Sequence, residues 1–250
     1  MTDSLTFIGR SLRHSVRSVD ALLTAIFLPV SIMLMFVYVF GGAIATPGLD
    51  YVDFLIPGII IQSMVFGGFV TALGLSEDLK KGLVDRFRSL PMSRSAVVTG
   101  RTLADVVTNV VQLVVMIGVG LAVGFRFSTS VPEVVAGILL ALLIGYAFSW
   151  VFAFIGLTAS SPEAANAFGF TVLFPLTFVS SAFVPVESMP GWLQPIAENN
   201  PFTHMVNAAR ALFVGTPAGN SIWLAVGWSL LIIAVFGPLS AWRYRRAVSH

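Results

Sequence analysis

The side chains that could carry out chemistry in this chain are few, and their spacing excludes most catalytic sites. The chain contains two lysines, Lys80 and Lys81, and neither follows a glycine. A phosphate-binding loop needs Gly-Lys-Ser/Thr, because its lysine neutralises the β- and γ-phosphates of ATP. The chain therefore lacks this type of ATP site. If it moves a solute with the energy of ATP, a separate subunit must hydrolyse the nucleotide.

Metal-ligating and nucleophilic side chains are also scarce. There is no cysteine, which excludes disulfides, thiolate zinc sites and cysteine nucleophiles. The histidines are His14, His204 and His250, which lie far apart with no metal-ligand spacing. We therefore expect no catalytic residues, no metal site and no cofactor in this chain.

The composition predicts that lipid, not water, surrounds most of the chain. Hydrophobic residues make up 56% of the 250 residues and charged residues only 10%, whereas a soluble domain carries about 25% charged residues. Runs of about 20 apolar residues are long enough to cross the hydrocarbon core as helices. Six such runs are predicted to be membrane spans: 21–42, 54–75, 106–125, 134–157, 164–184 and 221–242.

The basic residues predict how these spans are oriented. Of the 14 lysines and arginines, all except Arg126 and Arg210 precede the first span, separate the second from the third, or follow the sixth. The positive-inside rule therefore predicts a multi-pass protein of the plasma membrane with both termini in the cytoplasm. A signal peptide cleaved after the Ala-Ile-Ala sequence at 43–45 is an alternative. However, the apolar run before it is longer than a signal-peptide core.

The N-terminal segment 4–19 has the pattern of an amphipathic interfacial helix. Apolar residues such as Leu5 and Leu12 recur on one helical face, while Arg10 and Arg17 fall on another. We expect this helix to lie in the headgroup layer with its arginines toward anionic lipid. A purely topological role for the arginines is the alternative.

The cytoplasmic segment 76–101 carries a second amphipathic pattern. Leu79, Leu83 and Phe87 recur at helical spacing until Pro91 ends the helix. A short amphipathic helix bordered by charges of both signs is suited to docking into a groove on a soluble partner. A solvated loop that only obeys the positive-inside rule is the alternative.

Two shorter patterns indicate helix starts rather than functional sites. In the turn at 158–163, Ser160 or Ser161 can cap the fifth span before Pro162. Ser93 can cap a helix that leads into the third span.

The outer segment 187–215 is too long for a tight turn and too apolar for a free loop. Pro190 and Pro201 each fit the first turn of a short helix. We expect two short re-entrant helices that dip into the outer leaflet, where their backbone groups pair internally. Its polar residues are expected to act as caps and anchors rather than to contact substrate: Asn199, Asn200 and Arg210.

Three motifs carry a resemblance to a known family. The first is spread through the cytoplasmic segment, at Glu77, Asp78, Gly82, Asp85, Arg86, Arg88, Ser89, Leu90, Pro91, Ser93, Arg94, Gly100 and Arg101. The second is the Ala-Ser-Ser-Pro-Glu sequence at 159–163, and the third is F-V-P…M-P-G-W-L-Q-P-I-A…N-P-F-T…A-x-R between 183 and 210. Together they resemble the type-2 permease subunits of ATP-binding-cassette (ABC) exporters, most closely the daunorubicin-resistance type.

This resemblance implies an all-α integral membrane protein that forms one transmembrane domain over residues 1–250. Its expected parts are six transmembrane helices, the interfacial helix at 4–19, a cytoplasmic coupling helix within 76–101 and re-entrant helices within 187–215. It also implies a dimer that works with a separate ATPase subunit. The residues expected to contact the ATPase subunit are Glu77, Asp78, Leu79, Gly82, Leu83, Asp85, Arg86, Phe87, Arg88, Leu90, Pro91 and Arg94.

Two rival functions are weakened by the residues themselves. Proton coupling normally needs a carboxylate or histidine buried in a span. The six predicted spans contain no Asp, Glu, Lys, Arg or His, and Asp53 and Asp105 are expected at their interfacial margins. An intramembrane enzyme needs a nucleophile with a base, or metal ligands. Serines such as Ser149 occur in the spans, but no histidine or carboxylate accompanies them. A non-transporting membrane scaffold is a further alternative.

Polar and aromatic residues of the spans are the candidates for a substrate path. For any single polar residue, helix–helix hydrogen bonding is the simpler interpretation. The abundance of phenylalanine, at 21 residues, suits an apolar or amphipathic cargo such as a drug, polyketide or lipid rather than an ion. Pairing with a second copy or with a related permease is equally open. The path candidates are Gln62, Phe66, Asn109, Gln112, Asn166, Thr177 and Ser180.

Overall fold

The computed structural model describes residues 19–44, 46, 48–80 and 94–247, and every regular element in these residues is a helix. The apolar sequence dictates this, because only helices and closed barrels satisfy their backbone groups inside lipid. The elements in chain order are α2 (Val19–Met35), the π-helix η1 (Phe36–Phe40), α3 (Tyr51–Phe66), α4 (Phe69–Lys80), α6 (Arg94–Ala122), α7 (Val131–Thr158), α8 (Pro162–Phe178), the 3₁₀-helix η2 (Val186–Ser188), α9 (Gln194–Glu198), α10 (Pro201–Val214) and α11 (Ser221–Ala247). The all-α fold is as predicted.

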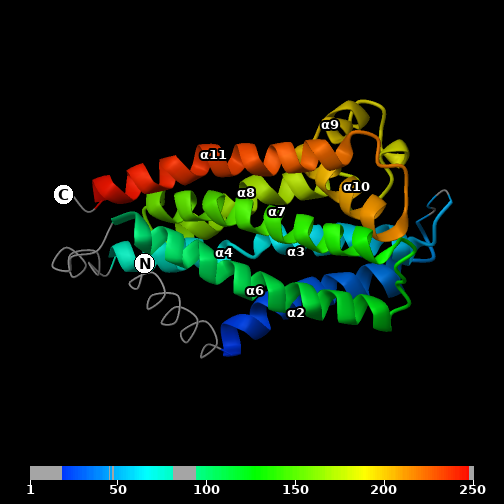
Figure 1. The fold of residues 1–250 in the computed structure, drawn as a ribbon, viewed down its shortest axis with the longest axis horizontal. Coiled ribbons are helices and arrows are strands. Elements are labelled where there is room, and N and C mark those ends of the chain that lie inside the picture. Colours follow the sequence, from blue (N-terminus) through cyan, green and yellow to red (C-terminus); the bar gives the residue numbers. More distant parts are fainter. Residues whose placement is uncertain (1–18, 45, 47, 81–93, 248–250) are drawn as a thin grey trace.

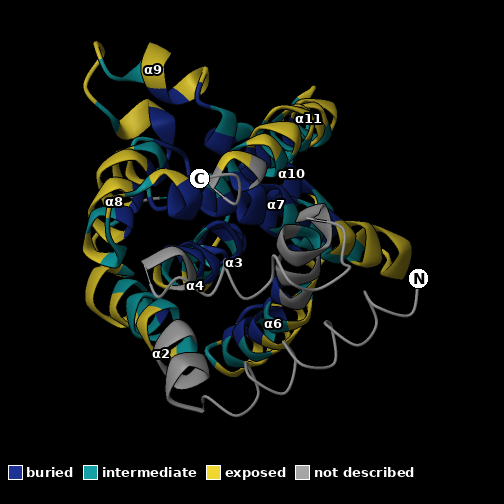
Figure 2. Cartoon of the chain, turned by 90° about the vertical axis from the view of Figure 1, so that its left-hand side faces the viewer, coloured by how far each residue is buried: buried dark blue, intermediate teal, exposed yellow. Residues whose placement is uncertain are grey.

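The long helices form one elongated bundle (Figure 1). α3 lies at its centre, where 13 of its 16 residues are buried. α7 packs against α3, α4, α6 and α11, so it joins the two sides of the bundle. Viewed along the bundle, α2, α6, α8 and α11 surround the buried centre and turn exposed faces outward (Figure 2).

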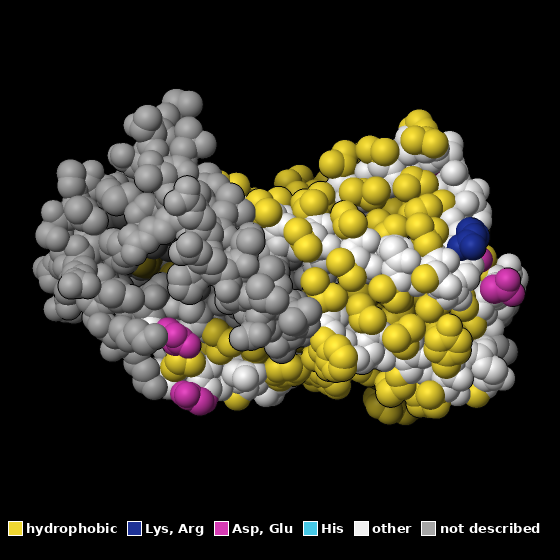
Figure 3. Space-filling model, turned by 90° about the horizontal axis from the view of Figure 1, so that it is seen from below, with side chains coloured by type: hydrophobic (Ala, Val, Ile, Leu, Met, Phe, Trp, Pro, Cys, Tyr) yellow, Lys and Arg dark blue, Asp and Glu magenta, His cyan; other side chains and the backbone are white. Residues whose placement is uncertain are grey.

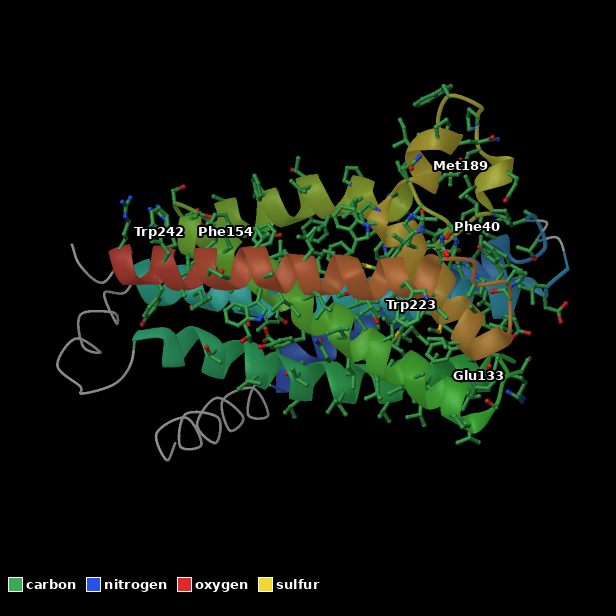
Figure 4. All side chains as sticks on the ribbon, turned by 45° about the horizontal axis from the view of Figure 1, so that its top comes forward. Phe40, Glu133, Phe154, Met189, Trp223 and Trp242 are labelled. Carbon is green, nitrogen blue, oxygen red and sulfur yellow. The ribbon has the colours of Figure 1, made fainter. Side chains whose placement is uncertain are left out.

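The surface is that of a bundle surrounded by lipid. On the face seen from below, hydrophobic side chains cover much of the described surface, while charged side chains gather toward the two ends (Figure 3). Trp223 and Trp242 are 78% and 48% exposed near opposite ends of α11 (Figure 4). Tryptophan at both ends of an apolar helix is typical of the two membrane–water interfaces.

Each of the six predicted spans coincides with helix, although the lengths differ. Among the described residues, four helical stretches are long and apolar enough to cross a membrane: Tyr51–Glu77, Asp105–Ala122, Val131–Thr158 and Ser221–Tyr244. The first predicted span matches the shorter apolar stretch Ile26–Phe40. The fifth matches α8, which ends at Phe178 and not at 184 as predicted, because Val179 leaves the helical conformation at φ −86° and ψ 62°.

The second predicted span is interrupted in a way that the sequence pattern did not predict. Gly67 and Gly68 separate α3 from α4. A Cβ added at Gly68 would lie 2.9 Å from Cα of Ser149 in α7, which is too close for any side chain. Gly68 therefore lets the chain approach α7 closely, and the Asn109 side chain of α6 packs against Gly67.

The outer connection between α8 and α11 differs in part from expectation. α10 begins at Pro201, as predicted, with Asn200 as its N-cap. Pro190, however, does not start a helix. Its carbonyl oxygen accepts hydrogen bonds from the backbone N–H groups of Leu193 and Gln194 in a turn. α9 starts only at Gln194, with Pro195 in its first turn.

Candidate functional site

The residues expected to contact an ATPase subunit lie where α4 ends and α6 begins. Glu77 is exposed on α4, Asp78 and Leu79 also belong to α4, and Arg94 is the first residue of α6. These two helix ends lie at the same end of the bundle as the last turns of α11 (Figure 1). The remaining eight candidates lie outside the described residues: Gly82, Leu83, Asp85, Arg86, Phe87, Arg88, Leu90 and Pro91. The predicted N-terminal helix at 4–19 likewise lies almost wholly outside them.

Three of the substrate-path candidates meet between α3 and α8. The Nε2 atom of Gln62 donates to the hydroxyl oxygen of Thr177 over 3.4 Å, and the hydroxyl of Ser180 donates to the carbonyl oxygen of Thr177. All three side chains are at least 94% buried. This cluster pairs its own polar groups, which is the helix–helix contact expected of polar residues in a membrane bundle.

Phe66 joins a group of stacked aromatic rings beside this cluster. Its ring centroid lies 5.9 Å from that of Phe170 in α8. Phe170 in turn lies 6.4 Å from Phe174, which lies 4.2 Å from Phe178 along the same helix. These three α8 rings are 37–44% exposed, so they present an apolar face to whatever covers α8.

Asn109 and Gln112 lie on α6 and point into the protein. They are 0% and 2% exposed. Within the described part of the chain, neither the Nδ2 nor the Oδ1 atom of Asn109 has a hydrogen-bond partner. Asn166, the remaining candidate, is exposed on α8, on the face turned away from the buried centre. The seven path candidates therefore fall into separate groups rather than one site.

Asp105 lies at the margin of its span, as expected, but it is buried against another helix. It is the first residue of the candidate span Asp105–Ala122, and its side chain is only 8% exposed. The hydroxyl of Thr71 in α4 lies 2.7 Å from both carboxylate oxygens and donates to them. The available signal was the helical spacing of Asp105 with Asn109 and Gln112, which puts all three on one face of α6.

Arg210 is the buried cation of the α10 end. It is 5% exposed, and its guanidinium donates to the carbonyl oxygens of Phe54 and Ser181 over 3.0 and 2.8 Å. A third donor reaches Oδ1 of Asn207 over 2.8 Å, and the Phe54 ring centroid lies 3.8 Å from Cζ. Burial lowers the pKa of Arg210 to about 9, which leaves it charged at neutral pH. The side chain anchors α10, as predicted, through these three hydrogen bonds.

Asn200 caps two helices at once. Its Oδ1 accepts from the backbone N–H of Phe202 at the start of α10. Its Nδ2 donates to the carbonyl oxygens of Leu176 and Val179 at the end of α8 over 2.7 and 2.6 Å. The predicted capping role is confirmed, and the second cap explains where α8 stops. Ser161 caps the other end of α8, as predicted, by accepting from the N–H of Ala164.

Comparison with known families identifies the class of this bundle. Residues 3–214 match the family model described as "ABC-2 type transporter". The chain belongs to the ABC-2 type transporter family. The match covers α2 to α10 and includes both the segment 76–101 and the outer segment, so all three motifs of the sequence resemblance lie within it.

The curated relatives reported below match between 81% and 100% of this ABC-2 protein. It is 36% identical to the "Daunorubicin resistance ABC transporter permease protein DrrB1" of Streptomyces coeruleorubidus, over 98% of this chain and 89% of that protein. It is 25% identical to the "Probable doxorubicin resistance ABC transporter permease protein DrrC" of Mycobacterium tuberculosis strain H37Rv, over 100% and 91%. It is 24% identical to the "Probable multidrug ABC transporter permease YbhR" of Escherichia coli K12, over 81% and 55%. This ABC-2 protein is thus a multi-pass membrane permease of an ABC transporter that works with an ABC ATPase subunit.

Proposed function

We propose that this chain is the membrane subunit of an exporter that moves a hydrophobic or amphipathic compound out of the cytoplasm, using ATP hydrolysed by a separate subunit. The proposal rests on one observation, the match along 98% of the chain to a permease named for daunorubicin resistance. The segment 76–101 is the proposed contact to the ATPase, because both of its flanking helices, α4 and α6, run into the bundle.

The cargo class follows from the side chains that the bundle offers. The exposed rings of Phe170, Phe174 and Phe178 and the buried amides of Gln62 and Asn109 suit a molecule with an apolar body and a polar group. Both termini are proposed to be cytoplasmic, at the end of the bundle where α11 finishes. The working unit is proposed to contain two permease copies or this chain with a related permease.

The test is ATP-dependent export by the reconstituted pair. We expect inside-out vesicles that contain this chain and its ABC ATPase subunit to accumulate doxorubicin, a fluorescent amphipathic compound, only when ATP is added. Vesicles with this chain alone should accumulate none and should bind no nucleotide specifically, because the chain lacks the phosphate-binding lysine motif. ATP-driven accumulation by the chain alone would contradict the proposal. So would a failure of the chain and its ATPase together to accumulate any amphipathic compound.

A further inference from the structure

One face of α6 is polar and buried in the middle part of the helix. Thr102, Asp105, Asn109 and Gln112 follow one another at spacings of three, four and three residues, so they lie on one helical face. Their exposed fractions are 0%, 8%, 0% and 2%. We name these four residues the polar seam. The opposite face of the helix is apolar and exposed, and it carries residues such as Val110 and Val114.

The polar seam ends near the middle of the bundle. Beyond Gln112 the buried face of α6 continues with Leu113, Met116 and Gly120. Ten residues separate Thr102 from Gln112, which corresponds to about 15 Å along a helix, or half of a hydrocarbon core of about 30 Å. A polar stripe therefore occupies α6 from Thr102 to Gln112, near mid-depth, and apolar side chains close it there.

Asn109 is the residue of the polar seam that static helix packing does not explain. Polar residues hold membrane helices together by hydrogen bonds between them. Asn109 is fully buried, yet both its amide atoms lack a partner among the described residues. Such a group loses its hydrogen bonds to water and gains none in return. A leucine of similar shape would pack there without that cost, so the amide has a use in another arrangement of the helices.

The surfaces that enclose Asn109 are suited to separation. A Cβ added at Gly145 of α7 would lie 2.6 Å from Nδ2, and one added at Gly67 would collide with Oδ1. Asn109 is thus held between two glycines, one of them at the Gly67–Gly68 break between α3 and α4. Neither glycine carries a side chain that would hold Asn109 in place, and the helix is interrupted at Gly67–Gly68.

We propose that the polar seam of α6 binds the polar end of an amphipathic cargo when α6 separates from the Gly67–Gly68 break and α7, and that the seam is closed in this structure. The inference rests on the proposed function and locates its cargo site. The Asp105 carboxylate accepts hydrogen bonds, and the amides of Asn109 and Gln112 both donate and accept. The cargo class is therefore an amphipathic compound with an amine or hydroxyl group. The Gln62–Thr177 cluster is self-paired and offers less to such a group.

The first test uses the absence of native cysteine. Asn109→Cys is introduced into the full chain in lipid nanodiscs and reacted with a charged methanethiosulfonate reagent. Val110→Cys on the exposed face of α6 and Ile60→Cys in the apolar centre are the controls. Because a minor open state brings water to the seam, the thiol at position 109 should react about tenfold faster than either control. Doxorubicin, which carries an amine and hydroxyl groups, should slow this reaction and leave both controls unchanged.

The second test separates a cargo role from a packing role. Asn109→Leu removes the buried amide and keeps its shape, so thermal stability should be equal or higher. Half-saturation of ATP-dependent doxorubicin export should need about fivefold to tenfold more compound, the effect of one lost hydrogen bond. Val110→Leu should change neither quantity. A residue that serves only packing would not move stability and export in opposite directions.

Each contrary result overturns the inference in its own way. Equal reactivity at positions 109, 110 and 60 would mean that the polar seam never opens. Reactivity without protection by doxorubicin, or unchanged export by Asn109→Leu, would mean that it opens but holds no cargo. Labelling and protection are measured on this chain without an ATPase. A negative labelling or protection result therefore contradicts the polar-seam inference alone. The proposed function is contradicted separately, if the wild-type chain and its ATPase together export nothing.

Discussion

Single polar side chains hold the α10 end of this bundle together. Arg210 bonds to two backbone carbonyls on different segments and to one amide, and it also stacks on the Phe54 ring. Asn200 satisfies groups at the end of α8 and at the start of α10. These carbonyls are buried or partly buried in the protein, where they have little water to bond to, so each such side chain stabilises more than one segment.

Arg210→Leu should therefore destabilise the protein without touching the cargo site. The substitution leaves the carbonyls of Phe54 and Ser181 buried without these donors, a loss of about 3 kcal/mol or more for bonds to a charged group. We expect a lower midpoint of thermal unfolding. The midpoint is measured by size-exclusion chromatography of protein that has been heated in detergent. Arg126→Leu is the matched control, because Arg126 bonds at the exposed surface. Equal midpoints for the two variants would refute the anchoring role.

At the scale of elements, the connection between α4 and α6 is the proposed place where force from an ATPase enters the bundle. α6 is a continuous helix from Arg94 to Ala122. It carries the polar seam, so a push on its first turn is delivered to the buried polar face. A rigid helix that can adopt two positions in the bundle is a physical means by which two distant sites can be coupled.

Charged substitutions in the coupling segment should detach the ATPase. Leu83→Asp and Phe87→Asp replace the expected apolar anchors, and loss of a central interface anchor costs about 2 kcal/mol or more, which is over about tenfold in affinity. Co-purification of the tagged ATPase measures this, with membrane insertion checked by immunoblot. Leu83→Met and Phe87→Leu keep the apolar character and should retain binding. If the aspartate variants assemble and export normally, the segment is only a topology signal.

At the scale of the whole molecule, the two ends of the bundle differ in kind. One end gathers the end of α4, the start of α6 and the end of α11, whereas the other carries η2, α9 and α10 (Figure 1). Met189 and Glu133 both lie toward this second end (Figure 4). The bias of basic residues toward the first end predicts that it faces the cytoplasm.

Cysteine labelling from the two sides of the membrane tests this orientation. Glu198→Cys, at an exposed position on α9, should react with an impermeant maleimide added to intact cells. Ser89→Cys in the segment 76–101 should react only after the cells are opened. Ile60→Cys, in the buried centre, should stay unlabelled by the maleimide in both cases. Reaction of both exposed positions in intact cells would exclude cytoplasmic placement of the loop.

The sequence by itself determined the class of the protein, its helical spans and several helix caps. Long apolar runs can satisfy their backbone groups in lipid only as helices or barrels, so composition alone decides the layer structure. Helix capping likewise depends on only a few neighbouring residues, which is why Ser161, Asn200 and Pro201 were predicted correctly. The family motifs added the expectation of an ATPase partner, which no single segment of the chain indicates by itself.

The tertiary structure alone decided which polar groups meet. Hydropathy measures transfer into lipid, and it cannot distinguish a residue that faces lipid from one that faces another helix. Asp105 looked interfacial by position and is buried against Thr71, while Asn166 looked internal and is exposed. The unpaired Asn109 between Gly67 and Gly145 could not be predicted either, because the contact joins three segments far apart in the chain. Close approach of helices is settled by packing across the whole bundle, and no local pattern contains it.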